Sequence, residues 1–466
     1  MLWACILLPQ LALDGVLRRR PGDGPLVLVA GAAHARSIVA ANTAAREAGL
    51  RVGQRLSAAQ ALSAPFEALP YEPELADRWH RFLAAVAYRY SSEVSLLPHA
   101  IVLEVSRSLS LFGAWPRLES LLRADLEALG FRHRISAAPT AHAAHVLAGV
   151  ADGQAVLERA HLRHALQRIP LQKSRLPAAA VEALPGMGIR TLGQLLSLPR
   201  DGLRRRFGAD LLLALDRLTG DAPAGLEAYR PPDGFDLRVE LSHEVENIGA
   251  LIFPLRRMTA DLAAWLAGRD GGVQRFVLQL EHREGITEVA VGLLAPEREA
   301  GMLFELARGR LEPVQLPQPV LAMRLIARDL PPFVPAGRDL FDERPAHALP
   351  IGQLRERLRA RLGDRAVHQL GSTTDPRPER AQKVAARDDD WQEPSPRPTW
   401  LLDRPMPLRG PAPRILAGPE RLETGWWDGG EVCRDYYVVE TAQGQRAWAF
   451  CAPGERAGWM LQGWFA

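Results

Sequence analysis

The segment SLLPHAIVLEVSRSLSLFG, residues 95–113, decides much of the fold of this chain. Within it, Ile101, Leu103 and Val105 fall on one side of an alternating pattern, and Val102, Glu104 and Ser106 fall on the other. This β-branched, alternating run predicts a strand that ends near Ser106. The residues before the strand are Leu-Pro-His-Ala (97–100), and the one acid within it is Glu104. A strand that begins without acids brings no set of hard oxygen ligands for a metal ion.

Arginine carries the basic charge of the chain. Among 466 residues Lys173 and Lys383 are the only lysines, and the net charge is +3. A chain of this length predicts about three or four domains with real cores. Guanidinium groups stay charged and fork onto oxyanions, so this composition suits phosphate contacts. A coding bias that replaces lysine by arginine throughout would look the same, and both explanations stay open.

Cysteine usage and hydropathy predict the compartment. Cys5, Cys433 and Cys451 form no CxxC pair, which favours a reducing environment and argues against structural zinc. The apolar N-terminus lacks a basic region before it, and no apolar run reaches about 18 residues. We expect a cytoplasmic, nucleoid-associated protein that contacts no membrane and uses neither a metal nor another cofactor.

Changes in sequence texture divide the chain into five parts. Residues 2–8 predict a buried strand and residues 38–50 an alanine-rich helix, within an α+β domain that has a mainly antiparallel sheet. Residues 175–220 predict helices, and a β-α-β-β-α-β order follows. Residues 372–413, rich in Pro, Arg and Asp, predict a linker that need not fold, before a small β-rich module. The predicted boundaries are 1–165, 166–230, 231–335, 336–413 and 414–466.

The helical part contains a helix-hairpin-helix, a motif that can hold DNA. Its LPGMGI turn places Gly186 and Gly188 where backbone N–H groups can meet a phosphate, with Arg190 beside them. The run Arg204-Arg205-Arg206 in the following helix can also contact phosphates, although a solvated helix face is the alternative. No strand precedes these glycines and Thr191 holds the last position of a GxGxxG pattern, so a dinucleotide site is rejected.

Four stretches of the chain match motifs of one enzyme family in order. They are ANTAAREAGLRVGQ (41–54), VLEVSRSLSLFG (102–113), RISAAPTAHAAHVLA (134–148) and IRTLGQLLSLPRDGLRRRFG (189–208). Together they resemble the Y-family, or translesion, DNA polymerases over roughly the first 335 residues. The resemblance implies an α+β multidomain fold. Its implied parts are a palm over 1–165 with fingers inserted at about 31–70, a thumb over 166–230 and a little finger over 231–335.

The resemblance also implies which residues stand at the catalytic positions. In the family, carboxylates hold two Mg²⁺ ions that drive nucleotidyl transfer. Here Leu7 and Pro9 occupy the first-strand positions, and His99 and Ala100 occupy the second pair. Since Mg²⁺ needs hard oxygen ligands, a catalytically inactive polymerase fold is implied.

Two other hypotheses compete with this one, and the sequence itself speaks against the first. One is an active, atypical Y-family translesion polymerase that uses Glu104 and Asp14 with Mn²⁺. The other is a DNA-binding module unrelated to replication. It rests on the hairpin alone and leaves the palm-like and fingers-like stretches unexplained.

The last 49 residues of the chain resemble one particular group within this family. Residues 418–466, with the stretches GWWDGG, RDYYVVET and GWMLQGWFA, resemble the ending of the polymerase-like adaptors of the bacterial SOS mutasome. This implies a hub that links primer-template DNA, the sliding clamp, a RecA-fold partner and an error-prone C-family polymerase. Most of the tail tryptophans are expected in a core. The candidate partner-binding residues are Trp426, Trp427, Tyr436 and Tyr437.

The same resemblance implies a clamp-binding peptide after the little finger. The best candidate is Leu340-Phe341, whose side chains could enter an apolar pocket of the clamp. Gly337 stands where such a peptide has glutamine. Gln353-Leu354 and Gln369-Leu370 are the alternatives.

Overall fold

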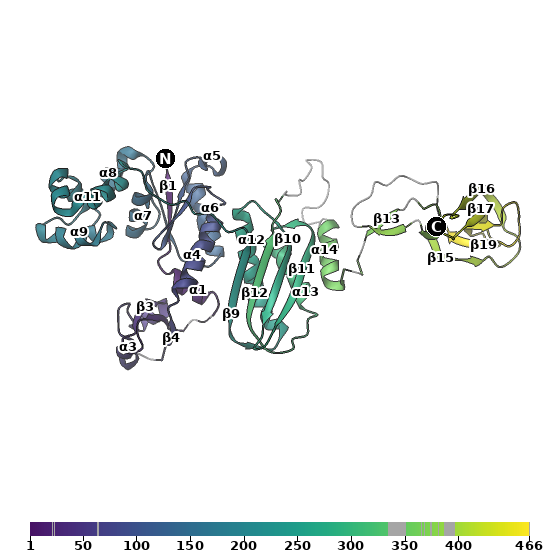
Figure 1. Ribbon diagram of the computed structural model, residues 1–466, viewed down its shortest axis with the longest axis horizontal. Coiled ribbons are helices and arrows are strands. Elements are labelled where there is room, and N and C mark those ends of the chain that lie inside the picture. The colour runs from purple at the N-terminus through teal and green to yellow at the C-terminus, as the bar shows by residue number, and fades with distance from the viewer. Residues whose placement is uncertain are drawn as a thin grey trace. The chain divides into compact units, whose positions relative to one another are not determined.

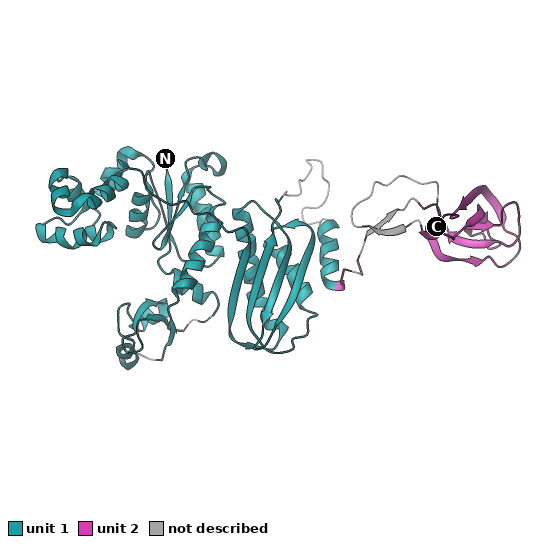
Figure 2. Cartoon of the chain, in the orientation of Figure 1, with its two compact units in different colours: residues 1–361 teal, residues 362–466 magenta. Residues whose placement is uncertain are grey.

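The structure is a computed structural model in two compact units, residues 1–361 and 362–466 (Figure 2). Among the described helices, none combines the length and apolar character that crossing a membrane requires. The described residues are 1–20, 22, 24–62, 65–333, 351–364, 366–367, 369–372, 375–380, 382–385 and 397–465.

A five-stranded sheet forms the centre of the first part of the chain (Figure 1). Its order is β5-β6-β1-β7-β8, and every pairing is antiparallel except β7 with β8. This confirms the predicted mainly antiparallel α+β domain. The strands are β1 (Trp3–Leu7), β5 (Val94–Leu97), β6 (Ala100–Glu104), β7 (Arg134–Ala138) and β8 (Gln154–Ala155).

Both faces of this sheet are covered, so its central strands are apolar on both sides. Along β1, Ala4 and Ile6 pack against α4 and α6, whereas Cys5 and Leu7 face α7. Side chains alternate between faces along a strand, which explains why an unbroken apolar run marks β1. The helices are α4 (Pro73–Ala87), α5 (Leu109–Phe112), α6 (Trp115–Ala128) and α7 (Ala141–Val150).

A small three-stranded sheet, β3-β2-β4, lies between β1 and α4 in sequence. The predicted helix over 38–50 is wrong at its start, because Ile38 and Val39 belong to a strand that pairs with β2. β-branched residues fit a pleated sheet better than a helix. Asn42 then caps a shorter helix by accepting a hydrogen bond from the Ala45 N–H (2.8 Å). These elements are α1 (Leu11–Leu17), β2 (Leu26–Ala30), β3 (Ser37–Ala41), α2 (Thr43–Glu47), α3 (Leu56–Leu62) and β4 (Glu67–Pro70).

A series of helices follows β8 and packs on the α7 side of the sheet. Leu184, Leu192 and Leu203 belong to the same apolar core as Cys5 and Leu7. The helices are α8 (Arg159–Leu166), η1 (Leu171–Lys173), α9 (Ala178–Ala183), η2 (Leu184–Met187), α10 (Leu192–Leu196) and α11 (Arg200–Thr219).

A second sheet, β11-β10-β12-β9, is antiparallel throughout and carries α12 and α13 on one face. The β-α-β-β-α-β order agrees with the sequence prediction. The helix α14 contacts this domain, where the Leu294 N–H donates to the Glu356 carboxylate. The elements are β9 (Phe235–Val245), α12 (Ile248–Gly268), β10 (Val273–Glu281), β11 (Ile286–Glu297), α13 (Ala300–Leu311), β12 (Val320–Asp329) and α14 (Ile351–Leu362).

α4 and α12 pack closely, so the two large sheets of the first unit share a junction. Gly268 lies against Ala85, and a Cβ there would collide with the Ala85 carbonyl oxygen. A buried ion pair joins Arg18 to Asp261, and the Arg18 carbonyl accepts from Arg257 (2.5 Å).

The second unit contains a five-stranded antiparallel sheet, β15-β19-β18-β17-β16. The predicted linker 372–413 is wrong over Trp400–Pro407, which is the strand β15 and pairs with β19. Pro405 argues against a strand in the sequence, but an edge strand such as β15 tolerates proline. Pro405 lies where the register between β15 and β19 shifts. The elements are β13 (Gln369–Ser372), η3 (Pro378–Arg380), β14 (Gln382–Ala385), β15 (Trp400–Pro407), β16 (Arg414–Thr424), β17 (Val432–Glu440), β18 (Arg446–Cys451) and β19 (Met460–Trp464).

Candidate functional site

The structure brings together the four residues at the predicted catalytic positions. Leu7 pairs with Ala100 across β1 and β6, and the Leu8 N–H donates to the His99 carbonyl oxygen (2.8 Å). Leu7 and Ala100 are buried, whereas Pro9 and His99 are exposed. This end of the sheet therefore presents apolar and imidazole groups, none of which is a hard anionic ligand.

The two acids of the manganese hypothesis lie at opposite ends of the sheet. Glu104 pairs with Trp3, whereas Asp14 bonds Arg132, two residues before the start of β7 at the Leu7 end of β1. Four residue steps of about 3.3 Å separate the two ends of β1, which is about 13 Å. A separation of that size is too long for one metal ion to bind both carboxylates.

Both acids are also engaged within the fold. The Glu104 carboxylate accepts from the N–H groups of Leu2 (3.3 Å) and Ser106 (3.1 Å). Asp14 accepts from the Arg132 backbone N–H and its Nε, each at 2.9 Å. Over the described ranges, no group of three or more His, Cys, Asp or Glu side chains is arranged to hold a metal ion.

His145 lies beside this end of the sheet, on the buried face of α7. Burial, with Arg175 as the next cause, lowers the pKa of His145 to about 3. Its imidazole is therefore neutral at physiological pH and adds no positive charge near Leu7 and His99.

The helix-hairpin-helix is a well-packed scaffold. Gly188 ends η2 with φ +82°, a left-handed conformation that favours glycine. Thr191 and Gln194 then form a reciprocal capping box at the start of α10. Within α11, Gly208 has non-helical backbone angles (φ +81°), so the helix is kinked there.

This geometry changes how the hairpin could bind a phosphate. The Gly188 N–H donates to the Pro185 carbonyl, the Ile189 N–H to the Leu184 carbonyl, and the Arg190 N–H to the Gln194 side chain (2.7 Å). These amides are already satisfied by the chain, so side chains must supply most of any phosphate contact.

The candidate arginines are available for that contact. Arg190, Arg204, Arg205 and Arg206 are all exposed, as are Gly186 and Gly188. In the part of the chain that the structure describes, the guanidinium groups of 204–206 have no ion-pair partner within 4 Å. An unpaired exposed arginine gives up no existing interaction when it binds a phosphate.

In the second unit, Trp426 and Trp427 stand out from the surface. They are 76% and 58% exposed and meet edge to face at 5.6 Å. The turn that carries them is fixed by Asp428, which accepts from the buried Arg377 and from Arg380. Two adjacent exposed tryptophans on a fixed turn form an apolar patch of the kind that binds partners.

Tyr436 and Tyr437, by contrast, are buried, so the prediction that they contact a partner is wrong. The Tyr436 ring stacks on Trp448 (4.2 Å), and the Tyr437 ring packs against Trp459. Neighbouring residues of a strand face opposite sides, and here both sides of β17 are covered. The predicted clamp peptide Leu340-Phe341 lies outside the described residues.

Comparison with known proteins identifies the relatives of this chain. Residues 16–149 match the impB/mucB/samB family. Protein ImuB from two strains of Caulobacter vibrioides, NA1000/CB15N and ATCC 19089/CB 15, is 28% identical over 437 residues, which covers 86% of this chain and 95% of the relative. This chain is similar to Protein ImuB over most of its length. The similarity to Protein ImuB extends into both units. The family match covers β5, β6 and β7 of the first sheet and all three strands of the small sheet.

Solved structures with a similar arrangement are Y-family polymerases. A Dbh ternary complex is 13% identical, with 72% of this chain and 100% of that chain covered and a TM-score of 0.43. DinB from Sulfolobus solfataricus has the same identity and coverage, with a TM-score of 0.40. A Y-family-like fold is assigned from the family match, the similarity to Protein ImuB and the element order, and these solved structures, with TM-scores below 0.5, carry no part of the assignment.

Two groups of residues give no signal in the sequence. Arg377 lies in the tract that is predicted to be a linker. Nothing in the sequence therefore indicates that it holds the turn of Trp426 and Trp427 through Asp428. Arg19 and Arg78 are brought near one another only by the packing of α1 and α4, and each alone resembles an ordinary surface arginine.

Proposed function

We propose that this ImuB-like chain is a non-catalytic DNA-binding adaptor in SOS-induced, error-prone translesion synthesis. In this proposal the β1–β8 sheet is a palm, the small sheet is part of the fingers, the helical part is a thumb and the β9–β12 domain is a little finger. The acid-free strand ends at Leu7 and His99, and the separation of Asp14 from Glu104, support a palm that does not catalyse nucleotidyl transfer.

The observation that carries DNA binding is the exposed, unpaired run Arg204-Arg205-Arg206 on the packed hairpin scaffold. Each arginine that neutralises one phosphate releases counterions, so the logarithm of the affinity falls with the logarithm of the salt concentration, by about 0.9 per phosphate. Three such contacts would contribute about 2.7 to that slope.

The test is fluorescence anisotropy of primer-template DNA over a series of salt concentrations. We expect R204A/R205A/R206A to weaken binding and to reduce the slope by about two to three. Arg117→Ala on α6, which also removes an exposed positive charge, is the matched control. An unchanged slope in the triple variant would remove the hairpin from the DNA interface.

The adaptor role assigns the second unit to protein partners: an ImuA-like RecA-fold protein and an error-prone C-family polymerase. The Trp426-Trp427 patch is the proposed contact, and Leu340-Phe341 is the proposed sliding-clamp contact. Pulldown with W426A/W427A should lose at least one partner. Trp400→Ala, which removes another exposed tryptophan of the same unit, should keep both.

The alternative function is an atypical polymerase that uses Asp14 and Glu104. Its requirement for two carboxylates at one metal ion conflicts with a separation of about 13 Å along β1. The adaptor proposal has no such requirement, so we favour it.

A further inference from the structure

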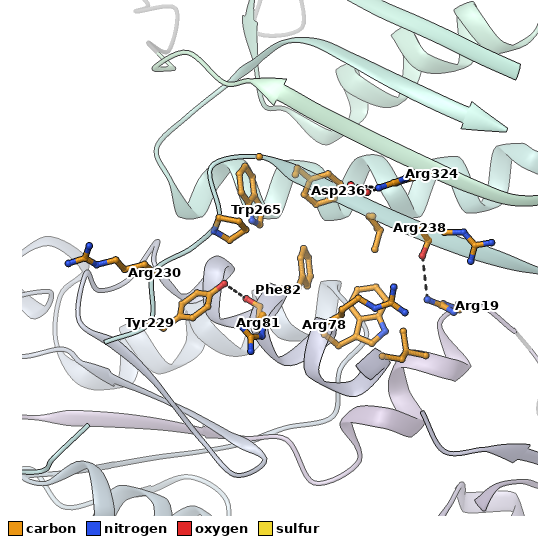
Figure 3. Close-up of a pocket in the computed structure, with 16 residues that line it drawn as sticks. Arg19, Arg78, Arg81, Phe82, Tyr229, Arg230, Asp236, Arg238, Trp265 and Arg324 are labelled. Carbon is orange, nitrogen blue, oxygen red and sulfur yellow. Dashed lines mark hydrogen bonds and ion pairs between the residues drawn. The ribbon is translucent and has the colours of Figure 1, made fainter. Parts of the chain in front are cut away.

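A cavity of about 690 Å³ lies in the first unit between α4, the start of β9 and α12 (Figure 3). Its lining combines aromatic side chains with several arginines, and Asp236 is the one acid among the lining residues. Small-molecule sites usually occupy about 300–1,000 Å³ and pair an apolar wall with a few polar groups. This cavity meets that description and lies apart from the hairpin arginines.

Among the described residues, three arginines of the cavity have no carboxylate within 4 Å: Arg19, Arg78 and Arg230. The other lining arginines are paired: Arg81 with Asp77, Arg238 with Glu281 and Arg324 with Asp236. Arg19 and Arg78 repel one another, and Glu72 and Glu240 offset only part of this repulsion, since neither lies within ion-pair distance of Arg19.

The environment of Arg19 shows this imbalance directly. Its Nε is buried without a hydrogen-bond partner, and its NH2 group reaches only the Arg238 carbonyl (3.4 Å). Burial, and then the Arg78 charge, lower the pKa of Arg19, while Glu72 and Glu240 oppose part of that effect from beyond ion-pair distance. An anion bound here would both satisfy a donor and relieve the repulsion.

The remaining wall is aromatic and rigid. Figure 3 shows Phe82 near the centre of the view, with Trp265 to its upper left and Tyr229 to its lower left. The Tyr229 hydroxyl donates to the Arg81 carbonyl (2.9 Å), which fixes that ring, and Gly268 locks α12 against α4. A fixed aromatic surface favours a flat ring system, since stacking then costs little ordering.

We propose that this cavity binds a nucleotide, with its phosphates between Arg19 and Arg78 and its base against Phe82 and Trp265. A free nucleotide and an unpaired nucleotide of a DNA strand both carry the phosphate and the base that this site would bind. The site is independent of the hairpin arginines and goes beyond the adaptor role.

The test uses the full-length protein with three probes: fluorescently labelled dATP, a labelled dT12 oligonucleotide and inorganic tripolyphosphate as competitor. We expect Arg78→Ala to weaken the binding of labelled dATP, of dT12, or of both by at least tenfold. Arg117→Ala should change neither. Loss with dATP assigns a free nucleotide, and loss with dT12 alone assigns a DNA strand.

A second variant tests the base contact. Phe82→Leu should weaken labelled dATP or dT12 but leave competition by tripolyphosphate unchanged, because tripolyphosphate has no base to stack. Equal affinities in Arg78→Ala and Arg117→Ala would overturn the site, and an unchanged Phe82→Leu would overturn its assignment to nucleotides. R204A/R205A/R206A should keep dATP binding, so a failure of this proposal is distinguishable from a failure of the hairpin proposal.

Discussion

Asp261→Ala should destabilise the first unit by about 3 kcal/mol, because it leaves the Arg18 guanidinium buried without its counter-charge. The side chains of Arg18 and Asp261 are 3% and 2% exposed, so water cannot replace the lost carboxylate. Breaking a buried pair typically costs about 3–5 kcal/mol. The lower end applies because Arg18 still donates to the Leu129 carbonyl and lies over the rings of Trp79 (4.8 Å) and Phe131 (4.6 Å).

The assay is urea unfolding of the full chain, followed by tryptophan fluorescence. Glu312→Ala is the matched control, since it breaks the exposed Arg308–Glu312 pair and should cost far less than Asp261→Ala. R18M/D261L, which removes both charges, should recover most of the stability. The reasoning is refuted if Asp261→Ala costs no more than Glu312→Ala, or if the double variant is less stable than Asp261→Ala.

Three further changes test other parts of the account. Thr191→Ala removes the capping box of α10 and should lower the free energy of unfolding by about 1 kcal/mol, measured by the same urea assay, whereas Ser110→Ala serves as a control outside any cap. Trp448→Ala should destabilise the second unit by about 3–5 kcal/mol because Trp448 is buried against Tyr436, whereas W426A/W427A should change its melting temperature little. The hydrogen bonds from Arg421 and from the Gly454 N–H lower the pKa of Asp435 to about 2. The stabilisation from that carboxylate is therefore complete above its unfolded pKa of about 3.9 and is lost as the pH falls towards 2. Acid unfolding of Asp435→Asn, followed by circular dichroism, should show a stability that depends less on pH in that range. An acid unfolding profile unchanged from the parent protein would contradict the assignment.

The sequence predicted the layers of the fold better than its local boundaries. The apolar run of β1 and the alternation in β6 were sufficient to predict a buried sheet, because side-chain periodicity reports burial directly. Ile38 and Val39 were assigned to a helix because alanines follow them, and only the pairing with β2 selects a strand. β15 escaped detection because Pro405 normally argues against a strand, and its place at a sheet edge is a tertiary fact.

Some residues of the candidate sites could be predicted from the sequence, and others could not. Arg204–Arg206 could be found in the sequence because they are consecutive and follow a recognisable hairpin. Arg19 and Arg78 could not, since 59 positions of chain separate them and only the packing of α1 on α4 brings them to one cavity. Tyr436 and Tyr437 look like surface aromatics in a polar stretch, and their burial depends on strands on both sides of β17.

Primer extension in Mg²⁺ and then in Mn²⁺, with DNA binding followed by anisotropy in the same tubes, tests the central claim most directly. The account predicts that the protein binds primer-template DNA and adds no nucleotide with either ion. Template-directed incorporation that is abolished by Asp14→Asn or Glu104→Gln would contradict it and make the protein an enzyme.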